Sequence, residues 1–204
     1  MVQLLSTEQM AEFANSGCLF FDGLIDNETN KEFLNDIGHT DIENVDNMQK
    51  YFQNIKASSS IPRIPAGTPL KNAYPHKSPL EKIFQNEVVA GAINSLVGSE
   101  AVVDHQFLHL TFPTKYFKKT NQRQMSQVNH QDSTIDPRIT FDIQLFYFPT
   151  DVTKEMGGTR YHPGTHLRIV NEMGIAKYQN IKGQKNIVCK AGTIGTVSYT
   201  HLRA

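Results

Sequence analysis

The sequence has no excess of either charge. Its 204 residues contain 20 acidic and 20 basic side chains, and its isoelectric point is near 7.1. A balanced chain has no general attraction for nucleic acid or for an anionic membrane surface. We therefore expect no nucleic acid and no membrane among its partners, which leaves small molecules and other proteins.

Long apolar runs and cysteines are also scarce. The most apolar stretches, residues 88–90 and 145–148, are far shorter than the roughly 20 residues that cross a bilayer. Cys18 and Cys189 are the two cysteines, and no charged-then-apolar leader opens the sequence. This composition argues against a secreted, disulfide-linked scaffold and predicts a cytoplasmic protein.

The first 37 residues predict a helix, a strand and a second helix. Ser6 caps an apolar stripe that ends at Gly17, and residues 18–21 then form a short apolar run. Asp26 opens a second stripe of apolar residues at helical spacing. Both helices begin with the residue types that satisfy the free N–H groups of a first turn.

Residues 40–80 lose regular periodicity and collect Asn, Ser and Pro. A long irregular stretch inside a compact domain is either a functional loop or a disordered one. We interpret residues 1–204 as a single domain with 40–80 as a loop or lid insertion. A lid over a pocket and a plain surface loop both remain open.

The second half of the chain alternates in the manner of strands. A helical pattern covers residues 78–98 first. The predicted strands are 102–110, 139–148, 159–162, 186–190 and 193–199. This order predicts a mainly β fold with flanking helices, in the form of a barrel or jelly roll.

His130 and Asp132 form the most informative motif. Side chains two apart on an extended segment point the same way, so both groups can reach one metal ion. Two His and one carboxylate are the ligand set of non-heme Fe(II) oxygenases. His39 and Asp41 have the same spacing, but they follow Gly38 in a polar run that we interpret as a solvated loop.

Three sequence motifs follow one another along the chain. They are the opening residues 5–25, the segment 127–132 with sequence QVNHQD, and the segment 157–166 with sequence GGTRYHPGTH. Together they resemble the phytanoyl-CoA dioxygenase family of Fe(II)/2-oxoglutarate oxygenases, over nearly the whole chain.

The resemblance implies a double-stranded β-helix that binds Fe(II) and 2-oxoglutarate and uses molecular oxygen. It makes His130 and Asp132 the first two iron ligands. Gln127 is implied as a contact of 2-oxoglutarate, and Phe146 as the aromatic beside it. For Phe146, an inward core aromatic is an equally open interpretation.

Other histidines and a basic run have plainer interpretations. In the family pattern the residue that matches His166 closes a turn and packs structurally. We interpret His162 and His109 as hydrogen-bonded residues of the core or pocket. The basic residues within 115–123 could meet an anionic substrate tail, although a solvated loop is the simpler interpretation.

The end of the chain departs from the family pattern. The last strand should lead to a distal iron-ligating His, with an Arg about ten residues beyond it that anchors 2-oxoglutarate. His201 comes about two residues early, and the chain stops at Ala204 before any anchoring Arg at that spacing. Either the last strand is incomplete and residues 197–204 are a foreign tail on a truncated chain, or His201 is the third ligand.

Three functions follow as hypotheses. The first is a 2-oxoglutarate-dependent hydroxylase of a small organic substrate, because Asp132 fills the position that a halogenase leaves for its halide. The second is a non-catalytic jelly-roll binding module without the anchoring Arg. The third is a cupin-like enzyme without 2-oxoglutarate, which needs His162 or His166 to face the pocket of His130.

Overall fold

The computed structural model describes residues 2–39, 60–110, 127–132, 142–178 and 180–204. The helices are α1 (Thr7–Ser16), α2 (Asn27–Asp36), α4 (Pro79–Gln85), α5 (Glu87–Val97) and α7 (Glu172–Ile175), with the short 3-10 turns η2 (Leu70–Asn72), η3 (Lys154–Met156) and η4 (Thr165–Leu167). The strands are β1 (Cys18–Phe21), β2 (Thr68–Pro69), β3 (Val102–Val103), β4 (Ile143–Phe148), β5 (Arg160–Tyr161), β6 (Lys185–Asn186) and β7 (Thr193–Ser198).

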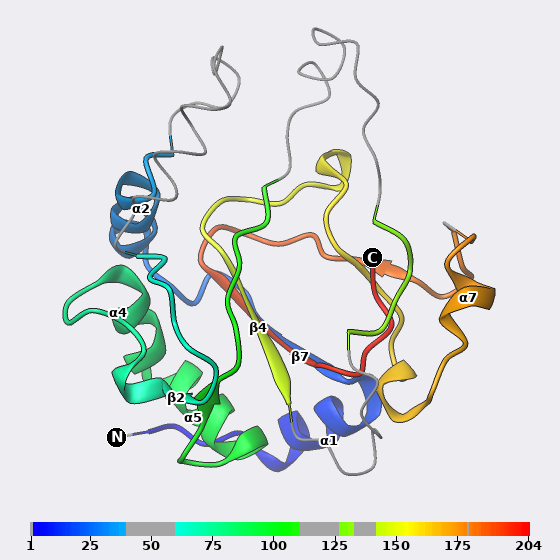
Figure 1. Cartoon of the computed structure of the whole chain (residues 1–204), viewed down its shortest axis with the longest axis horizontal. Coiled ribbons are helices and arrows are strands. Elements are labelled where there is room, and N and C mark those ends of the chain that lie inside the picture. The colour runs from blue at the N-terminus through cyan, green and yellow to red at the C-terminus, as the bar shows by residue number, and fades with distance from the viewer. Residues whose placement is uncertain (1, 40–59, 111–126, 133–141, 179) are drawn as a thin grey trace, which may run out of the picture.

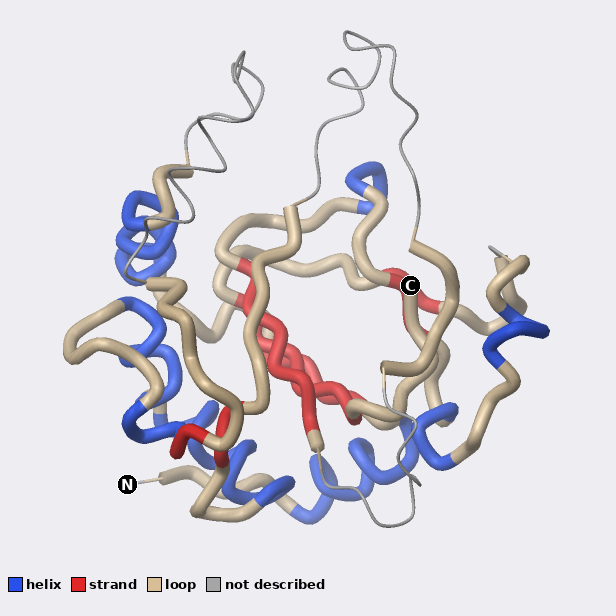
Figure 2. Tube along the Cα trace, in the orientation of Figure 1, coloured by secondary structure: helices blue, strands red, loops and turns tan. Residues whose placement is uncertain are grey.

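The fold is mixed α/β with small antiparallel sheets, whereas the sequence predicted a mainly β fold. The described residues form one sheet of three strands and two sheets of two strands (Figures 1 and 2). Most expected strands are shorter than their apolar alternation suggested, because alternation alone does not supply a partner strand for hydrogen bonding. The complete double-stranded β-helix therefore stays a prediction.

The three-stranded sheet has the order β1-β7-β4, and both pairings are antiparallel. Phe20 of β1 and Phe146 of β4 both pair with Gly195 of β7. Gly195 is required there because a Cβ atom on it would lie 2.6 Å from the Phe20 ring. The sheet thus joins residues near the two ends of the sequence to the strand that follows the His130 segment.

One face of this sheet packs against helices. Ile194 of β7 is completely buried and belongs to a core cluster with Ile83 of α4 and Val89 of α5. Figure 1 shows α2, α4 and α5 on one side of the crossing strands, with the C-terminus on the other. Successive residues of a strand point to opposite faces. Phe20 and Phe146, one position away, therefore point away from the helices.

The predicted helices near the N-terminus are confirmed. Ser6 accepts a hydrogen bond from the Gln9 N–H while the Gln9 side chain accepts one from the Ser6 N–H. Gly17 ends α1 with a φ of 77°, which costs glycine little. Asp26 caps α2 through the Thr29 N–H at 2.8 Å. Each pair satisfies donors that the first turn of a helix leaves free.

The helical pattern over residues 78–98 forms two helices instead of one. Asn86 ends α4 and starts α5, where its side chain accepts hydrogen bonds from the Val88 and Val89 N–H groups. Asparagine competes with the helix for backbone donors, so it favours a break and a new start.

Three strand predictions were too long. The strand expected over 102–110 is reduced to β3, which pairs with β2 for two residues. Of the strand expected over 186–190, Asn186 belongs to β6, and Cys189 forms an isolated bridge with Val152. Thr159 and His162 likewise lie outside β5.

The predicted insertion over residues 40–80 is described in part, because residues 40–59 lie outside the described residues. Residues 60–80 contain β2 and η2 and lead into α4. A lid role for this stretch stays a prediction, as does the single-domain assignment. Across the ranges that the structure describes, no helix combines the length and the apolar character needed to cross a bilayer.

Candidate functional site

The segment that carries the His130 motif lies against the C-terminal residues. The His130 N–H donates to the Arg203 carbonyl at 2.9 Å, and the Arg203 N–H donates to the His130 carbonyl at 3.0 Å. Arg203 also bridges Tyr161 on its other side. The extended backbone predicted for this segment is therefore found at His130, where a single antiparallel bridge fixes it.

The imidazole of His130 and the carboxylate of Asp132 converge. The His130 Nε2 lies 3.0 Å from the Asp132 Oδ1, and both side chains are about one fifth exposed. The other ring nitrogen, Nδ1, lies 2.7 Å from the Val128 carbonyl, which can only accept a hydrogen bond. We therefore assign the Nδ1 proton to that bond, which turns the lone pair of Nε2 toward Asp132.

This arrangement brings two hydrogen-bond acceptors face to face. In the neutral ring, Nε2 and the Asp132 Oδ1 each carry a lone pair at 3.0 Å. Such a contact is favourable only when positive charge lies between or beside the two atoms, as a proton on the ring or as a metal ion. The pair can thus hold a proton or take part in binding a cation.

Gln127 lies beside this pair. Its side-chain nitrogen is 3.4 Å from the His130 Nε2, and its carbonyl accepts a hydrogen bond from Arg160 at 3.2 Å. A side-chain amide at this place can contact a ligand next to His130. The predicted role of Gln127 in holding 2-oxoglutarate stays a prediction.

Phe146 lies on the sheet face that points away from the helices. Its ring stacks against Phe148 with centroids 6.0 Å apart and planes at 13°. Both rings stand on β4, on the side of the sheet that Phe20 also occupies. The position suits an aromatic wall, and its predicted role beside a cosubstrate stays a prediction.

His201 is fully buried and engaged elsewhere. Its Nε2 lies 3.0 Å from the Ser16 carbonyl, and its Nδ1 lies 3.1 Å from the Leu202 carbonyl. Burial lowers the pKa of this imidazole below its ordinary value. To serve as the predicted third ligand, His201 would have to leave the Ser16 carbonyl.

His162 has the hydrogen-bonded environment that we expected for it, and His166 packs in the interior as its family position implied. The same expectation was wrong for His109, which is exposed and whose ring lies 4.6 Å from that of Phe107. His162 is buried with its Nε2 3.3 Å from the Asn129 Oδ1. His166 is buried with its Nε2 3.2 Å from the Ala14 carbonyl, and its ring stacks on His201 at 5.9 Å. The alternative His-Asp pair cannot be compared, because Asp41 lies outside the described residues.

Arg203 is the residue of the site that sequence reasoning missed. Its Nη2 forms an ion pair with the Asp132 Oδ2, and its side chain is 6% exposed. Its Nη1 is buried without a hydrogen-bond partner among the described residues. Burial lowers the pKa of the guanidinium to about 10, which leaves it charged at neutral pH. The sequence contained one indication of it. The family pattern places the distal ligand about two residues after His201, which is the position of Arg203.

The described residues bring together two of the predicted ligands of a facial iron site, and their ligand role stays a prediction. His130 and Asp132 are in place, but the described ranges contain no group of three His, Cys, Asp or Glu side chains suited to a metal ion. The second oxygen of Asp132 faces the Arg203 guanidinium instead. With Arg203 in this position, the set does not fit a three-ligand metal site.

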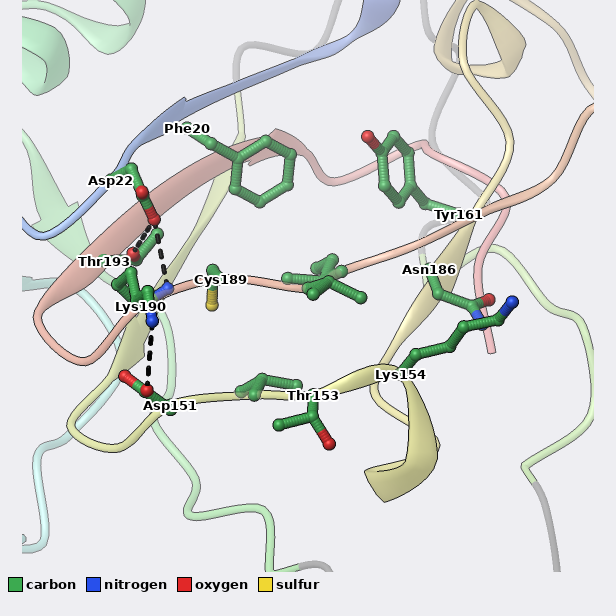
Figure 3. Close-up of a pocket in the computed structure, with 13 residues that line it drawn as sticks. Phe20, Asp22, Asp151, Thr153, Lys154, Tyr161, Asn186, Cys189, Lys190 and Thr193 are labelled. Carbon is green, nitrogen blue, oxygen red and sulfur yellow. Dashed lines mark hydrogen bonds and ion pairs between the residues drawn. The ribbon is translucent and has the colours of Figure 1, made fainter.

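A pocket of about 480 Å³ lies beside β1 and β7 (Figure 3). Phe20 and Tyr161 line it, and their ring centroids are 5.8 Å apart. At its other end the Lys190 N–H donates to Asp22 at 3.1 Å, and the Lys190 Nζ lies 3.5 Å from Asp151. The pocket is therefore lined by aromatic rings and by several charged side chains, which include Lys154 on the side of Tyr161 (Figure 3).

Tyr161 connects this pocket with the His130 motif. Its side chain lines the pocket, and its backbone bridges Arg203, whose guanidinium contacts Asp132. Burial raises the pKa of the phenol to about 12, which keeps it protonated at neutral pH. A small molecule in the pocket would meet an uncharged hydroxyl at Tyr161.

Comparison with known proteins gives one family match. The family model described as phytanoyl-CoA dioxygenase (PhyH) matches residues 13–194. No curated protein matches the chain. The matched range includes His130 and Asp132 and ends before His201 and Arg203.

Proposed function

Because this chain belongs to the phytanoyl-CoA dioxygenase family, we propose that it is an Fe(II)- and 2-oxoglutarate-dependent dioxygenase that hydroxylates a small organic substrate. The family predicted from the motifs is confirmed, and members of the family are Fe(II)/2-oxoglutarate oxygenases. The family also implies a double-stranded β-helix, and we infer that β1, β7 and β4 form one wall of it.

The approach of His130 to Asp132 carries this proposal. Their facing atoms are 3.0 Å apart, and the Nδ1 contact with the Val128 carbonyl directs the Nε2 lone pair, which Gln127 also approaches at 3.4 Å, toward the place where a cation would bind. Metal-binding histidines commonly donate their other N–H to a carbonyl or carboxylate, which fixes the ring. His130 has this support before any metal binds.

We assign roles to the residues around this pair. His130 and Asp132 would hold the iron, Gln127 would contact 2-oxoglutarate, and Phe146 would supply an aromatic wall. His201 stays the predicted third ligand, conditional on its release from Ser16. When bound, iron with 2-oxoglutarate and oxygen supplies the oxidising power, and Asp132 favours hydroxylation because it fills the position that a halide would need.

An anaerobic titration tests the proposal. Fe(II) and 2-oxoglutarate together should give a visible charge-transfer absorption band, and Asp132→Ala should abolish it. Asp41→Ala is the matched control, because Asp41 belongs to the other His-x-Asp motif of the chain. A band that survives Asp132→Ala but not Asp41→Ala would refute the assignment.

A second candidate function is a non-catalytic binding module of the same fold. The ion pair between Arg203 and Asp132 favours it, because it uses the carboxylate that the iron needs. In that case the titration gives no band with the parental protein, and purified protein forms no succinate from 2-oxoglutarate. A band together with succinate formation would exclude the module.

A further inference from the structure

We infer that the Arg203 guanidinium takes the place of the divalent cation at Asp132 and so competes with the metal that the family binds. In this chain the metal then binds more weakly, because the guanidinium has to leave the carboxylate first. The inference rests on the proposal that His130 and Asp132 are the metal-binding pair.

The backbone puts residue 203 directly beside the proposed metal pair. Arg203 and His130 exchange two backbone hydrogen bonds, at 2.9 and 3.0 Å, as directly opposed residues of an antiparallel pair do. In such a pair the Cα atoms are about 5.5 Å apart and the side chains project to the same face. The side chain of residue 203 thus shares a face with His130 and reaches Asp132.

Charge then explains how the arginine and a metal ion compete. The guanidinium contacts the Asp132 Oδ2, while the Oδ1 faces His130 at 3.0 Å. A divalent ion bound to this carboxylate would lie a few ångströms from a fixed positive charge in a place that is shielded from water. Repulsion at such distances is strong where the local dielectric is low.

The arginine is also imperfectly satisfied where it lies. Its Nη1 is buried without a hydrogen-bond partner among the described residues, although a guanidinium has five N–H donors to place. A shorter neutral imidazole at this position would remove the positive charge and offer a lone pair to a metal ion. His201, two residues earlier, cannot do this while its ring nitrogens contact Ser16 and Leu202.

Cobalt(II) titration of tag-free full-length chain tests the inference, since cobalt bound by nitrogen and oxygen ligands gives visible absorption. Arg203→His should bind Co(II) at least about tenfold more tightly than the parental chain, an effect of the size expected for groups that shape a metal site. Arg168→His is the matched control, because it adds the same side chain at an exposed position. It should bind like the parental chain.

A second substitution links the gain to the proposed pair. Asp132→Asn in the Arg203→His background should remove the added affinity. If Arg203→His fails to fold, as judged by circular dichroism, Arg203→Gln carries the test, and removal of the charge alone should still tighten Co(II) binding several-fold.

The possible failures are distinguishable. One outcome is that the parental chain binds Co(II) as tightly as both arginine variants and that Asp132→Asn abolishes this binding. Arg203 then does not compete with the metal ion, while the metal-binding role of His130 and Asp132 stands. If the gain in Arg203→His survives Asp132→Asn, or if no variant binds Co(II), the inference and the proposed metal pair both fall.

Discussion

The two sides of the three-stranded sheet are stabilised by different forces. The helix side is apolar and closed, with Ile194 fully buried against α4 and α5. Beyond the other side, His130, Asp132 and Arg203 are held by an ion pair and by contacts to backbone carbonyls. Apolar burial is non-directional and adds over many atoms, whereas a buried charge depends on one partner. The stability of the helix side therefore depends on buried apolar volume, whereas the geometry of the site depends on single charged partners.

Removing core volume should have the largest effect on stability. Ile194→Ala leaves a cavity between the sheet and the helices, and we expect a loss of about 2–5 kcal/mol in the free energy of unfolding. Urea unfolding followed by circular dichroism measures it. Ile169→Ala is the matched control, because Ile169 is 81% exposed. Equal effects of the two substitutions would show that the helix side is not the core.

Breaking the charge pair should have the next largest effect. Asp132→Asn leaves the buried Arg203 guanidinium without its counter-charge, and we expect a loss of about 1–3 kcal/mol in unfolding free energy. Asp104→Asn, which changes a 79% exposed carboxylate, should leave the urea midpoint unchanged. If Asp132→Asn is as stable as the parental chain, the ion pair contributes nothing to the fold.

A fall in pH should weaken the site side of the molecule. Burial lowers the pKa of both His166 and His201 below the ordinary value of 6.5. Below pH 6.5 the unfolded chain therefore binds protons that the folded chain does not, so the free energy of unfolding falls as pH falls.

Urea midpoints at pH 7.5, 6.5 and 5.5 measure this dependence. His166→Asn should reduce the slope of stability against pH. A slope of the opposite sign would contradict the burial of these rings.

Loss of a helix cap should have the smallest effect. Ser6→Ala removes the oxygen that accepts the Gln9 N–H, and we expect a loss of about 1 kcal/mol. Ser99→Ala, the same change at an exposed position outside any helix, should be neutral. Thermal unfolding of the two variants against the parental chain measures the difference, and equal melting temperatures would refute the role of the cap.

Local elements were predictable where the signal lies within a few residues. The caps at Ser6 and Asp26 and the stop at Gly17 follow from hydrogen bonds between near neighbours. The strands over 102–110 and 186–190 were not, because strand length depends on a partner strand that lies far away in sequence.

The candidate site also contains one part that local sequence predicts and one part that it does not. His130 and Asp132 are two residues apart, so an extended backbone alone brings them together, and the structure places them 3.0 Å apart. Arg203 lies 71 residues after Asp132 in sequence, and its role depends on which residue pairs with His130. A shift of register by one residue would turn a different side chain toward the carboxylate.

The sequence by itself determined the helix caps, the short strand at residues 18–21 and the family, because these depend on short-range patterns in a fixed order. The tertiary structure alone decided that Arg203 faces Asp132 while His201 faces Ser16. The physical reason is that antiparallel pairing sets the partner of each residue, and no local property of the C-terminal segment specifies that register.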